Sequence, residues 1–182
     1  MSAEADDIIF ALGTNPTTAS YFNPEDHFSI VSSTDLKTWT VVTNVNSGIP
    51  GSVHVWVPEW YVEGGVARVL ANIDIGEKKN FRPYIFTAEN SSLTSWSGPV
   101  DMGIGAPGKN RIDTVMVKSG GTYHVFTKEN YTLHATSSSK TGPWTWVGTG
   151  DWAGWGNELE GPSIVKVGST WRIFMDPMHA PG

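Results

Sequence analysis

Two acidic residues each stand just before a run of alternating apolar residues. Glu160 precedes Gly161-Pro162, and Asp113 precedes Thr114 at the start of a similar run. Gly-Pro fixes a tight strand entry, so we expect the Glu160 carboxyl to be aimed at one end of its strand. A carboxyl in a partly apolar pocket near a second carboxylate has a raised pKa and can donate a proton. Such a pair indicates acid and base chemistry of the kind that sugar hydrolysis needs.

Aromatic residues accompany these positions. Trp56 and Glu59 belong to a third entry of the same kind, "WVPEW", and His54 lies two residues before Trp56. Trp152 and Trp155 lie in the glycine-rich loop "GDWAGWGNELEGP" just before Glu160. Indole faces stack on the apolar faces of sugar rings, so we expect a carbohydrate-binding surface that includes these five residues.

The three entries begin a repeated hairpin. They are the segments "WVPEWYVEGGVARVLANI", "RIDTVMVKSGGTYHVFTKEN" and "LEGPSIVKVGSTWRIFMD", and each alternates apolar and polar residues on both sides of a turn. Counted from Pro58, Thr114 and Pro162, the turn lies seven residues later, at Gly65, Gly121 and Ser169. The spacing therefore predicts three hairpins of one design.

A second element repeats at nearly the same intervals. A polar Ser/Thr run that ends in tryptophan recurs with the tryptophans 57 and then 48 residues apart, while the hairpin entries are 56 and then 48 apart. These tryptophans, Trp39, Trp96 and Trp144, are predicted to be packing residues, as is Trp171. The period is that of a four-stranded blade, so the sequence predicts an all-β fold, a β-propeller. A β-sandwich with similar turns is the alternative.

The phase of the repeat predicts an incomplete propeller of about three to four blades in a single domain over residues 1–182. The segment "IIFALGTN" is expected to be the second strand of a hairpin, with Asp6-Asp7 at its turn, and the partner tryptophan of Pro162 is expected beyond residue 182. The expected chain holds the outer part of one blade, two whole blades and the inner hairpin of a fourth. The blade segments are approximately 1–45, 52–101, 108–149 and 156–182.

Composition limits the classes of partner. With 182 residues, 39% hydrophobic and 16% charged, the chain is predicted to be globular. A net charge of −6 without a basic cluster disfavours nucleic acid and anionic membranes. No cysteine is present, no metal-ligand spacing or cofactor motif occurs, and neither a secretory signal nor an 18-residue apolar segment is found. We expect a soluble chain without metal or cofactor, which is cytoplasmic, or secreted if a signal was removed.

The motifs together resemble consecutive blades of the family-43 glycoside hydrolases. These are five-bladed propellers that cleave arabinose- or xylose-containing plant polysaccharides with inversion. The resemblance covers most of the chain and implies that Glu160, in E-G-P, is the general acid. It implies that Asp113, in the I-D-P motif, tunes and orients that acid, and that Trp56, in the W-A-P-E/D motif, shapes the sugar subsite. Thr114 replaces the proline of the second motif, and Val57 replaces the alanine of the third.

Two hypotheses follow from this resemblance. In the first, the chain is a glycosidase that acts on arabinose- or xylose-containing oligosaccharides or polysaccharides. Its general base is unidentified, because that aspartate belongs to the innermost strand of the first blade, and Asp6 and Asp7 are expected at a turn on the wrong side. In the second, the chain is a catalytically inactive carbohydrate-binding or structural propeller fragment. An incomplete propeller exposes strand edges, so we also expect a possible homodimer.

Overall fold

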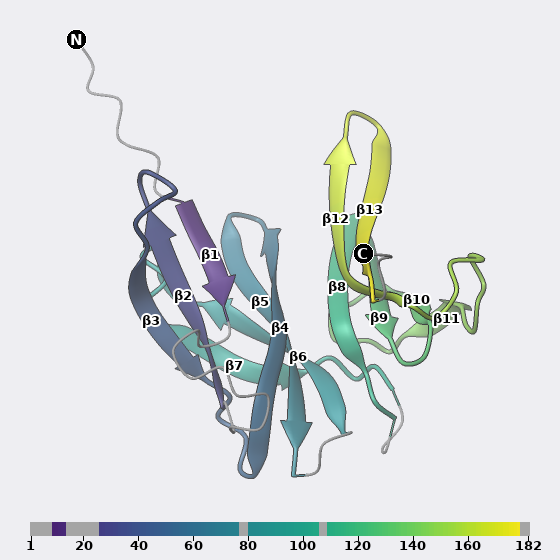
Figure 1. Ribbon diagram of the computed structural model, residues 1–182, viewed down its shortest axis with the longest axis horizontal. Helices are drawn as coiled ribbons and strands as arrows, with labels where there is room; N and C mark the ends of the chain where they lie inside the picture. The colour runs from purple at the N-terminus through teal and green to yellow at the C-terminus, as the bar shows by residue number, and fades with distance from the viewer. Residues whose placement is uncertain (1–8, 14–25, 77–79, 106–108, 179–182) are drawn as a thin grey trace.

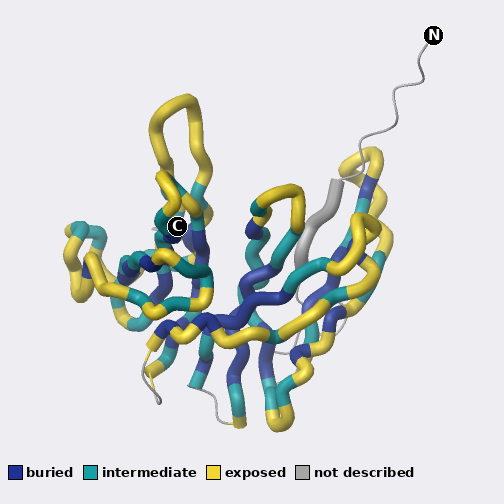
Figure 2. The backbone as a smooth tube through the Cα atoms, turned by 180° about the vertical axis from the view of Figure 1, so that it is seen from behind, coloured by how far each residue is buried: buried dark blue, intermediate teal, exposed yellow. Residues whose placement is uncertain are grey.

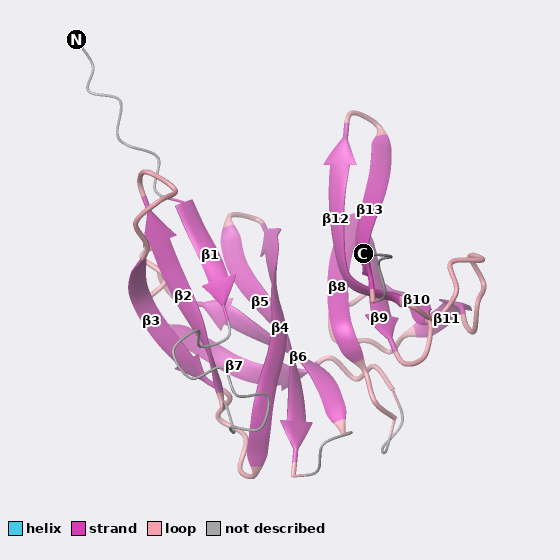
Figure 3. Cartoon of the chain, viewed as in Figure 1, coloured by secondary structure: helices cyan, strands magenta, loops and turns pink. Residues whose placement is uncertain are grey.

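Residues 9–13, 26–76, 80–105 and 109–178 are described by the structure, a computed structural model. Within these ranges every regular element is a β-strand (Figure 3), so the all-β prediction is confirmed. The strands form four antiparallel sheets, in each of which neighbours in the sheet are also neighbours in sequence. No helix of the described residues is long and apolar enough to cross a membrane. The predicted turn at Asp6-Asp7 lies outside the described residues.

The four sheets contain three, four, four and two strands in chain order. The first consists of β1 (Ile9–Gly13), β2 (His27–Ser33) and β3 (Thr40–Asn46), and the second of β4 (Ser52–Glu63), β5 (Val66–Ile75), β6 (Phe81–Ala88) and β7 (Trp96–Asp101). The third consists of β8 (Ile112–Ser119), β9 (Thr122–Lys128), β10 (Thr132–Ser137) and β11 (Thr145–Gly148), and the fourth of β12 (Leu159–Val167) and β13 (Thr170–Pro177).

The first strands of the last three sheets lie near one another. Figure 1 shows the first two sheets on one side of the molecule and the last two on the other. Strand β8 contacts both β4 and β12, so it stands between the other two first strands. Residues at the beginnings of β8 and β12 can therefore meet.

The predicted hairpins are present because their glycines permit two-residue turns. Strands β4 and β5 join through Gly64 and Gly65, with φ of 61° and 75°, and Gly120 and Gly121 join β8 to β9 with φ of 58° and 85°. A type I′ turn requires positive φ at both central residues, which suits glycine. The third hairpin turns through Gly168 and Ser169, because Val167 pairs with Thr170. All three predicted turn positions are confirmed.

Apolar side chains join the first three sheets to one another. One buried cluster connects the first and second sheets through Phe28, Ile30, Val69 and Phe86, among others. A second cluster connects the second and third sheets, and its buried members are Tyr61, Leu70, Ile85, Met102, Ile104, Met116, Tyr123, Val125 and Ala135. Figure 2 shows buried segments in the middle of the molecule and an exposed tip on the hairpin β12–β13.

The predicted packing tryptophans divide into two groups. Trp96 packs against the first cluster and Trp144 against the second, as expected. Trp39 and Trp171 instead remain 41% and 39% exposed. Trp171 lies on β13 and Trp39 directly precedes β3, so both belong to sheets that have fewer than four strands.

Candidate active site

The first strands of the last three sheets, β4, β8 and β12, are the inner strands, and each carries the same irregularity in its pairing with the next strand. The pairing register shifts between Trp56 and Glu59 in β4, between Ile112 and Val115 in β8, and between Glu160 and Ser163 in β12. In each shift one residue has positive φ: Val57 at 48°, Asp113 at 53° and Gly161 at 55°. A bulge of this kind bends the strand and turns a side chain away from the regular alternation.

The backbone conformation at these bulges is costly for Val57 above all. Glycine adopts positive φ freely and aspartate tolerates it, whereas a β-branched valine there is an outlier. Strained residues of this kind cluster at functional sites, where the surrounding structure holds them in place. The three bulges therefore indicate a functional site at the entries of β4, β8 and β12.

The structure brings Glu160 and Asp113 together. The backbone N–H of Gly161, which follows Glu160, donates a hydrogen bond of 3.2 Å to Oδ2 of Asp113. Asp113 is only 6% exposed, and this burial raises the pKa of its carboxyl group. The Gly161 N–H opposes that rise and the nearby charge of Glu160 adds to it. Two carboxyl groups from neighbouring sheets thus lie near each other.

A lysine that the sequence analysis missed lies beside this pair. The Nζ atom of Lys128, at the end of β9, is 3.2 Å from Oε1 of Glu160 and 2.9 Å from the backbone oxygen of Leu159. The Lys128 side chain is only 6% exposed. The hairpin register could have placed Lys128 near Asp113, because Lys128 pairs with Ile112, the residue directly before Asp113.

Glu59 faces a separate hollow. Its Oε2 accepts a 3.2 Å hydrogen bond from the backbone N–H of Trp60, and burial raises the pKa of its carboxyl group. The hollow has a volume of about 280 Å³ and is lined by residues of β4, β8, β12 and β13, including Glu63 and Lys118. Glu59 therefore lies between the inner strands, although Asp113 and Glu160 do not line this hollow.

Trp56 and His54 form an aromatic group at the beginning of β4. The Trp56 ring stacks on Phe81 with 4.5 Å between ring centroids, and the His54 ring lies 5.4 Å from Trp56. His54 is only 4% exposed, and its Nδ1 lies 3.6 Å from Oδ2 of the fully buried Asp74. His54 thus packs against Trp56 and has little surface of its own to offer a ligand.

Trp152 and Trp155 lie in a groove between the third and fourth sheets. Their rings are 5.4 Å apart, and Nε1 of Trp152 donates to the backbone oxygen of Thr132 at 2.9 Å. The groove has a volume of about 290 Å³, and the residues around it are Val117, Ser119, His124, Phe126, Ile164, Trp171, Arg172 and Ile173. Neither Glu160 nor Asp113 lines it, so the structure separates this tryptophan pair from the carboxylate pair.

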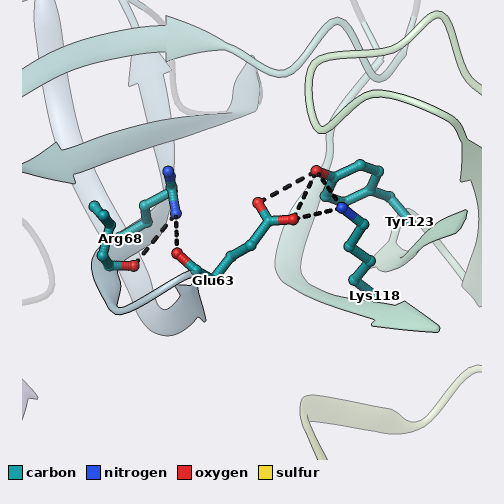
Figure 4. A network of polar contacts seen from close by, with 5 residues as sticks. Glu63, Arg68, Lys118 and Tyr123 are labelled. Carbon is teal, nitrogen blue, oxygen red and sulfur yellow. Dashed lines mark hydrogen bonds and ion pairs between the residues drawn. The ribbon is translucent and has the colours of Figure 1, made fainter. Parts of the chain in front are cut away.

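A polar network ties the second sheet to the third at the far end of the inner strands. Figure 4 shows Glu63 of β4 receiving hydrogen bonds from Lys118 and Tyr123, at 2.6 and 2.9 Å to Oε1. Arg68 Nη1 donates to the backbone oxygen of Glu63 at 3.3 Å. This network lies next to the turns, away from the bulged entries, and we assign it to joining the sheets.

The described residues contain no group of three or more His, Asp or Glu side chains arranged to hold a metal ion. Asp6 and Asp7 lie outside the described residues. Besides Glu160 and Asp113, the bulged entries carry one acidic residue, Glu59, and it faces the separate hollow. The general base of an inverting reaction is thus not identified at these entries.

Comparison with known proteins places the chain in a family. A family model described as "Probable glycosyl hydrolase domain", named as related to family 43, matches residues 14–182. Comparison with curated proteins finds no matching relative.

Solved structures share the fold at low sequence identity. The Bacteroides ovatus xyloglucan PUL GH43B matches with a TM-score of 0.59 and 18% identity, over 85% of this chain and 34% of that one. The Bombyx mori GH32 beta-fructofuranosidase BmSUC1 matches with 0.62 and 17%, over 86% and 36%. An alpha-L-arabinofuranosidase from Lactobacillus brevis matches with 0.62 and 12%, over 96% and 61%.

These likenesses complete the assignment of the fold. With successive sheets of three, four, four and two strands, the prediction of an incomplete β-propeller is confirmed. The chain spans about a third of the length of the first two of these structures.

Proposed function

Because the chain belongs to the probable glycosyl hydrolase domain family related to glycoside hydrolase family 43, we propose that it carries the general acid of a glycosidase. The observation that supports this most is the pairing of Glu160 with Asp113 across two neighbouring sheets, through the Gly161 N–H bond. In the proposed reaction Glu160 gives its proton to the glycosidic oxygen as the bond between sugar carbon and oxygen breaks. Water attacks the same carbon from the opposite face, and a second carboxylate takes the proton of that water.

The contacts of Glu160 indicate different roles for its two carboxyl oxygens. Lys128 bonds to Oε1, so the proton for the leaving oxygen is carried on Oε2. Asp113 accepts the backbone N–H of Gly161 and so holds the chain directly after Glu160, and burial raises the pKa of its own carboxyl group. We assign Asp113 as a positioning residue and Trp56 and Glu59 as sugar-contacting residues.

The proposed substrates are oligosaccharides or polysaccharides that contain arabinose or xylose, cleaved with inversion. Two structural relatives, the Bacteroides ovatus xyloglucan PUL GH43B and the Lactobacillus brevis alpha-L-arabinofuranosidase, are named for such sugars. An inverting reaction also needs a base about 6.5–9.5 Å from the acid, and the entries described above do not supply one.

Chromogenic arabinofuranosides and xylosides test the acid. Glu160→Gln is expected to lower kcat by about 10²–10⁴-fold on a substrate with a poor leaving group, since general acid catalysis supplies a factor of that size. A dinitrophenyl glycoside, whose leaving group needs little protonation, is expected to lose much less. The matched control is Glu158→Gln, two residues earlier on an exposed loop. Unchanged kcat in Glu160→Gln on the poor leaving group would rule out the assigned role.

A second function, carbohydrate binding without turnover, has its own supporting observation. The tryptophan pair Trp152 and Trp155 lies in a groove that the carboxylate pair does not line. For this function, calorimetry with arabino- and xylo-oligosaccharides is expected to give the same affinity for the natural chain and for Glu160→Gln, with no hydrolysis by either.

We further propose that two copies associate through the fourth sheet. Among the described residues β13 pairs with β12 alone, and the hairpin exposes the apolar side chains Val165, Val167, Trp171 and Phe174. Open strand edges of this kind template association. Sedimentation at micromolar concentration is expected to show a homodimer or larger assembly, and a folded species that stays monomeric would refute it.

A further inference from the structure

Lys128 differs from the other paired lysines in its burial. Lys109 and Lys118, which pair with Glu129 and Glu63, are 56% and 39% exposed, whereas the Lys128 side chain is 6% exposed. An ammonium group removed from water is destabilising unless its donors are bonded. The buried ammonium of Lys128 therefore needs a hydrogen-bond acceptor for each of its N–H groups.

The acceptors of Lys128 all come from the fourth sheet and the residue that follows it. Its Nζ atom lies 2.9 Å from the Leu159 oxygen, 3.2 Å from Oε1 of Glu160 and 3.2 Å from Sδ of Met178. An ammonium has three N–H donors, so these three acceptors account for all of them. The Lys128 side chain thus reaches from the third sheet to the fourth, and all three N–H groups of its ammonium have acceptors there.

Together with Asp113, Lys128 holds the backbone on both sides of Glu160. Lys128 binds the carbonyl oxygen of Leu159, the residue before Glu160, and Asp113 binds the N–H of Gly161, the residue after it. Both anchors come from one place on the third sheet, because Lys128 pairs with Ile112, the neighbour of Asp113.

We propose that Lys128 is a positioning residue that sets the orientation of the Glu160 carboxyl group through Oε1 and through the Leu159 carbonyl. This inference rests on the proposed function, in which Glu160 is the general acid. The positive charge of Lys128 also acts on the neighbouring carboxyl, since it lowers the pKa of Asp113 while the charge of Glu160 raises it. Removing the ammonium is expected to leave the two neighbouring carboxyl groups without this cation.

Two measurements on the full chain test this role. In Lys128→Met, carboxyl-carbon NMR is expected to show the pKa of Asp113 raised further, because a nearby opposite charge that lowers it is lost. On chromogenic glycosides kcat is expected to fall about tenfold or more while KM changes little, because the misplaced group acts in the transition state. The matched control is Lys166→Met, an exposed lysine of β12, which is expected to change neither quantity.

Lys128→Arg keeps the charge and guards against a variant that fails to fold. The planar guanidinium does not reproduce three bonds from one compact ammonium, so kcat is expected to fall while the Asp113 titration stays near that of the natural chain. Natural kcat in Lys128→Arg, or an unchanged Asp113 titration in folded Lys128→Met, would overturn the inference.

The two readouts also separate this inference from the proposed function. If no variant and not even the natural chain hydrolyses a glycoside, but Lys128→Met shifts the Asp113 titration, the proposed function fails and the coupling of Lys128 to the carboxylate pair stands. If hydrolysis depends on Glu160 but Lys128→Met keeps the natural kcat, the inference about Lys128 fails and the proposed function stands.

Discussion

The two junctions of the third sheet are built in different ways. Toward the second sheet, it packs through a buried apolar cluster that includes Leu70, Met116 and Val125. Toward the fourth sheet, Ile164 and Ile173 are only half-buried and line a groove of about 290 Å³. That junction is instead joined by polar bonds at one end, from the Gly161 N–H to Asp113 and from Lys128 to the hairpin.

The apolar junction and the polar junction are suited to different roles, the first to stability and the second to the chemistry of the site. Apolar burial stabilises in proportion to area and tolerates small movements, whereas a hydrogen bond requires its own distance and direction. The first junction is thus suited to holding the propeller together, and the second to fixing the position of a carboxyl group. Substitutions at the two junctions are expected to show in different measurements.

Truncating one apolar residue at each junction gives the largest expected effect. Leu70 is fully buried, so Leu70→Ala is expected to lower the free energy of unfolding by about 2–5 kcal/mol, the loss of transfer energy plus a cavity. Ile164→Ala is expected to lower it by clearly less, because the side chain is half-buried beside an open groove. Urea denaturation at low protein concentration measures both, and equal losses would contradict the difference between the junctions.

The pH dependence of stability gives the next effect. Burial raises the pKa of Asp113 above its ordinary value of 3.8, so the folded chain binds this proton more tightly than the unfolded chain. The free energy of unfolding of the natural chain, relative to Asp113→Asn, is therefore expected to fall as the pH rises from 3.8 through the raised pKa. Outside that window the difference is expected to be constant.

Asp35 supplies a control of opposite sign. Backbone N–H groups of Thr38 and Lys37 lower the pKa of Asp35 to about 2. Its contribution to stability, measured against Asp35→Asn, is present above pH 3.8 and is expected to be lost as the pH falls toward 2. If Asp113 followed the same direction as Asp35, burial would not dominate at the carboxylate pair.

The sequence predicted the features that depend on neighbours along the chain. Glycine pairs such as Gly120-Gly121 predicted the turns, and the regular spacing of the entries predicted successive sheets. Glu160 and Asp113 were found because both precede the alternating run of a repeated hairpin, although in the repeat Asp113 is equivalent to Gly161 and not to Glu160. These features need only local backbone preference and alternation, which the sequence shows directly.

The features that were missed depend on contacts between sheets. The hairpin register places Lys128 next to Asp113, but Lys128 and Glu160 are 32 residues apart, and the local sequence does not show that this lysine is buried against the fourth sheet. The positive φ of Val57 contradicts the preference of valine and follows from a bulge in β4 like the one that contains Asp113 in β8. Trp152 and Trp155 were expected near Glu160 by sequence proximity, but the loop folds back over the outer strands of its own sheet, where Trp152 bonds to Thr132.

The smallest expected effect on stability is at Trp155, in the groove of the weaker junction. Its ring is half-buried, and Gly154 and Gly156 on either side have positive φ of 69° and 75°. The edge contact with Trp152 is worth about 1 kcal/mol, so Trp155→Ala is expected to lower the melting temperature by only about 2–4 °C. Because an indole face is lost, the affinity for xylo- or arabino-oligosaccharides, measured by calorimetry, is expected to fall.

Trp146→Ala is the matched control, because Trp146 is an exposed tryptophan of β11 that faces Arg111 and does not line the groove. It is expected to leave sugar affinity unchanged. A melting temperature lowered by many degrees in Trp155→Ala, with natural sugar affinity, would make Trp155 a packing residue. The third and fourth sheets would then be joined by apolar contact after all, and the contrast with the junction of the second and third sheets would be one of degree.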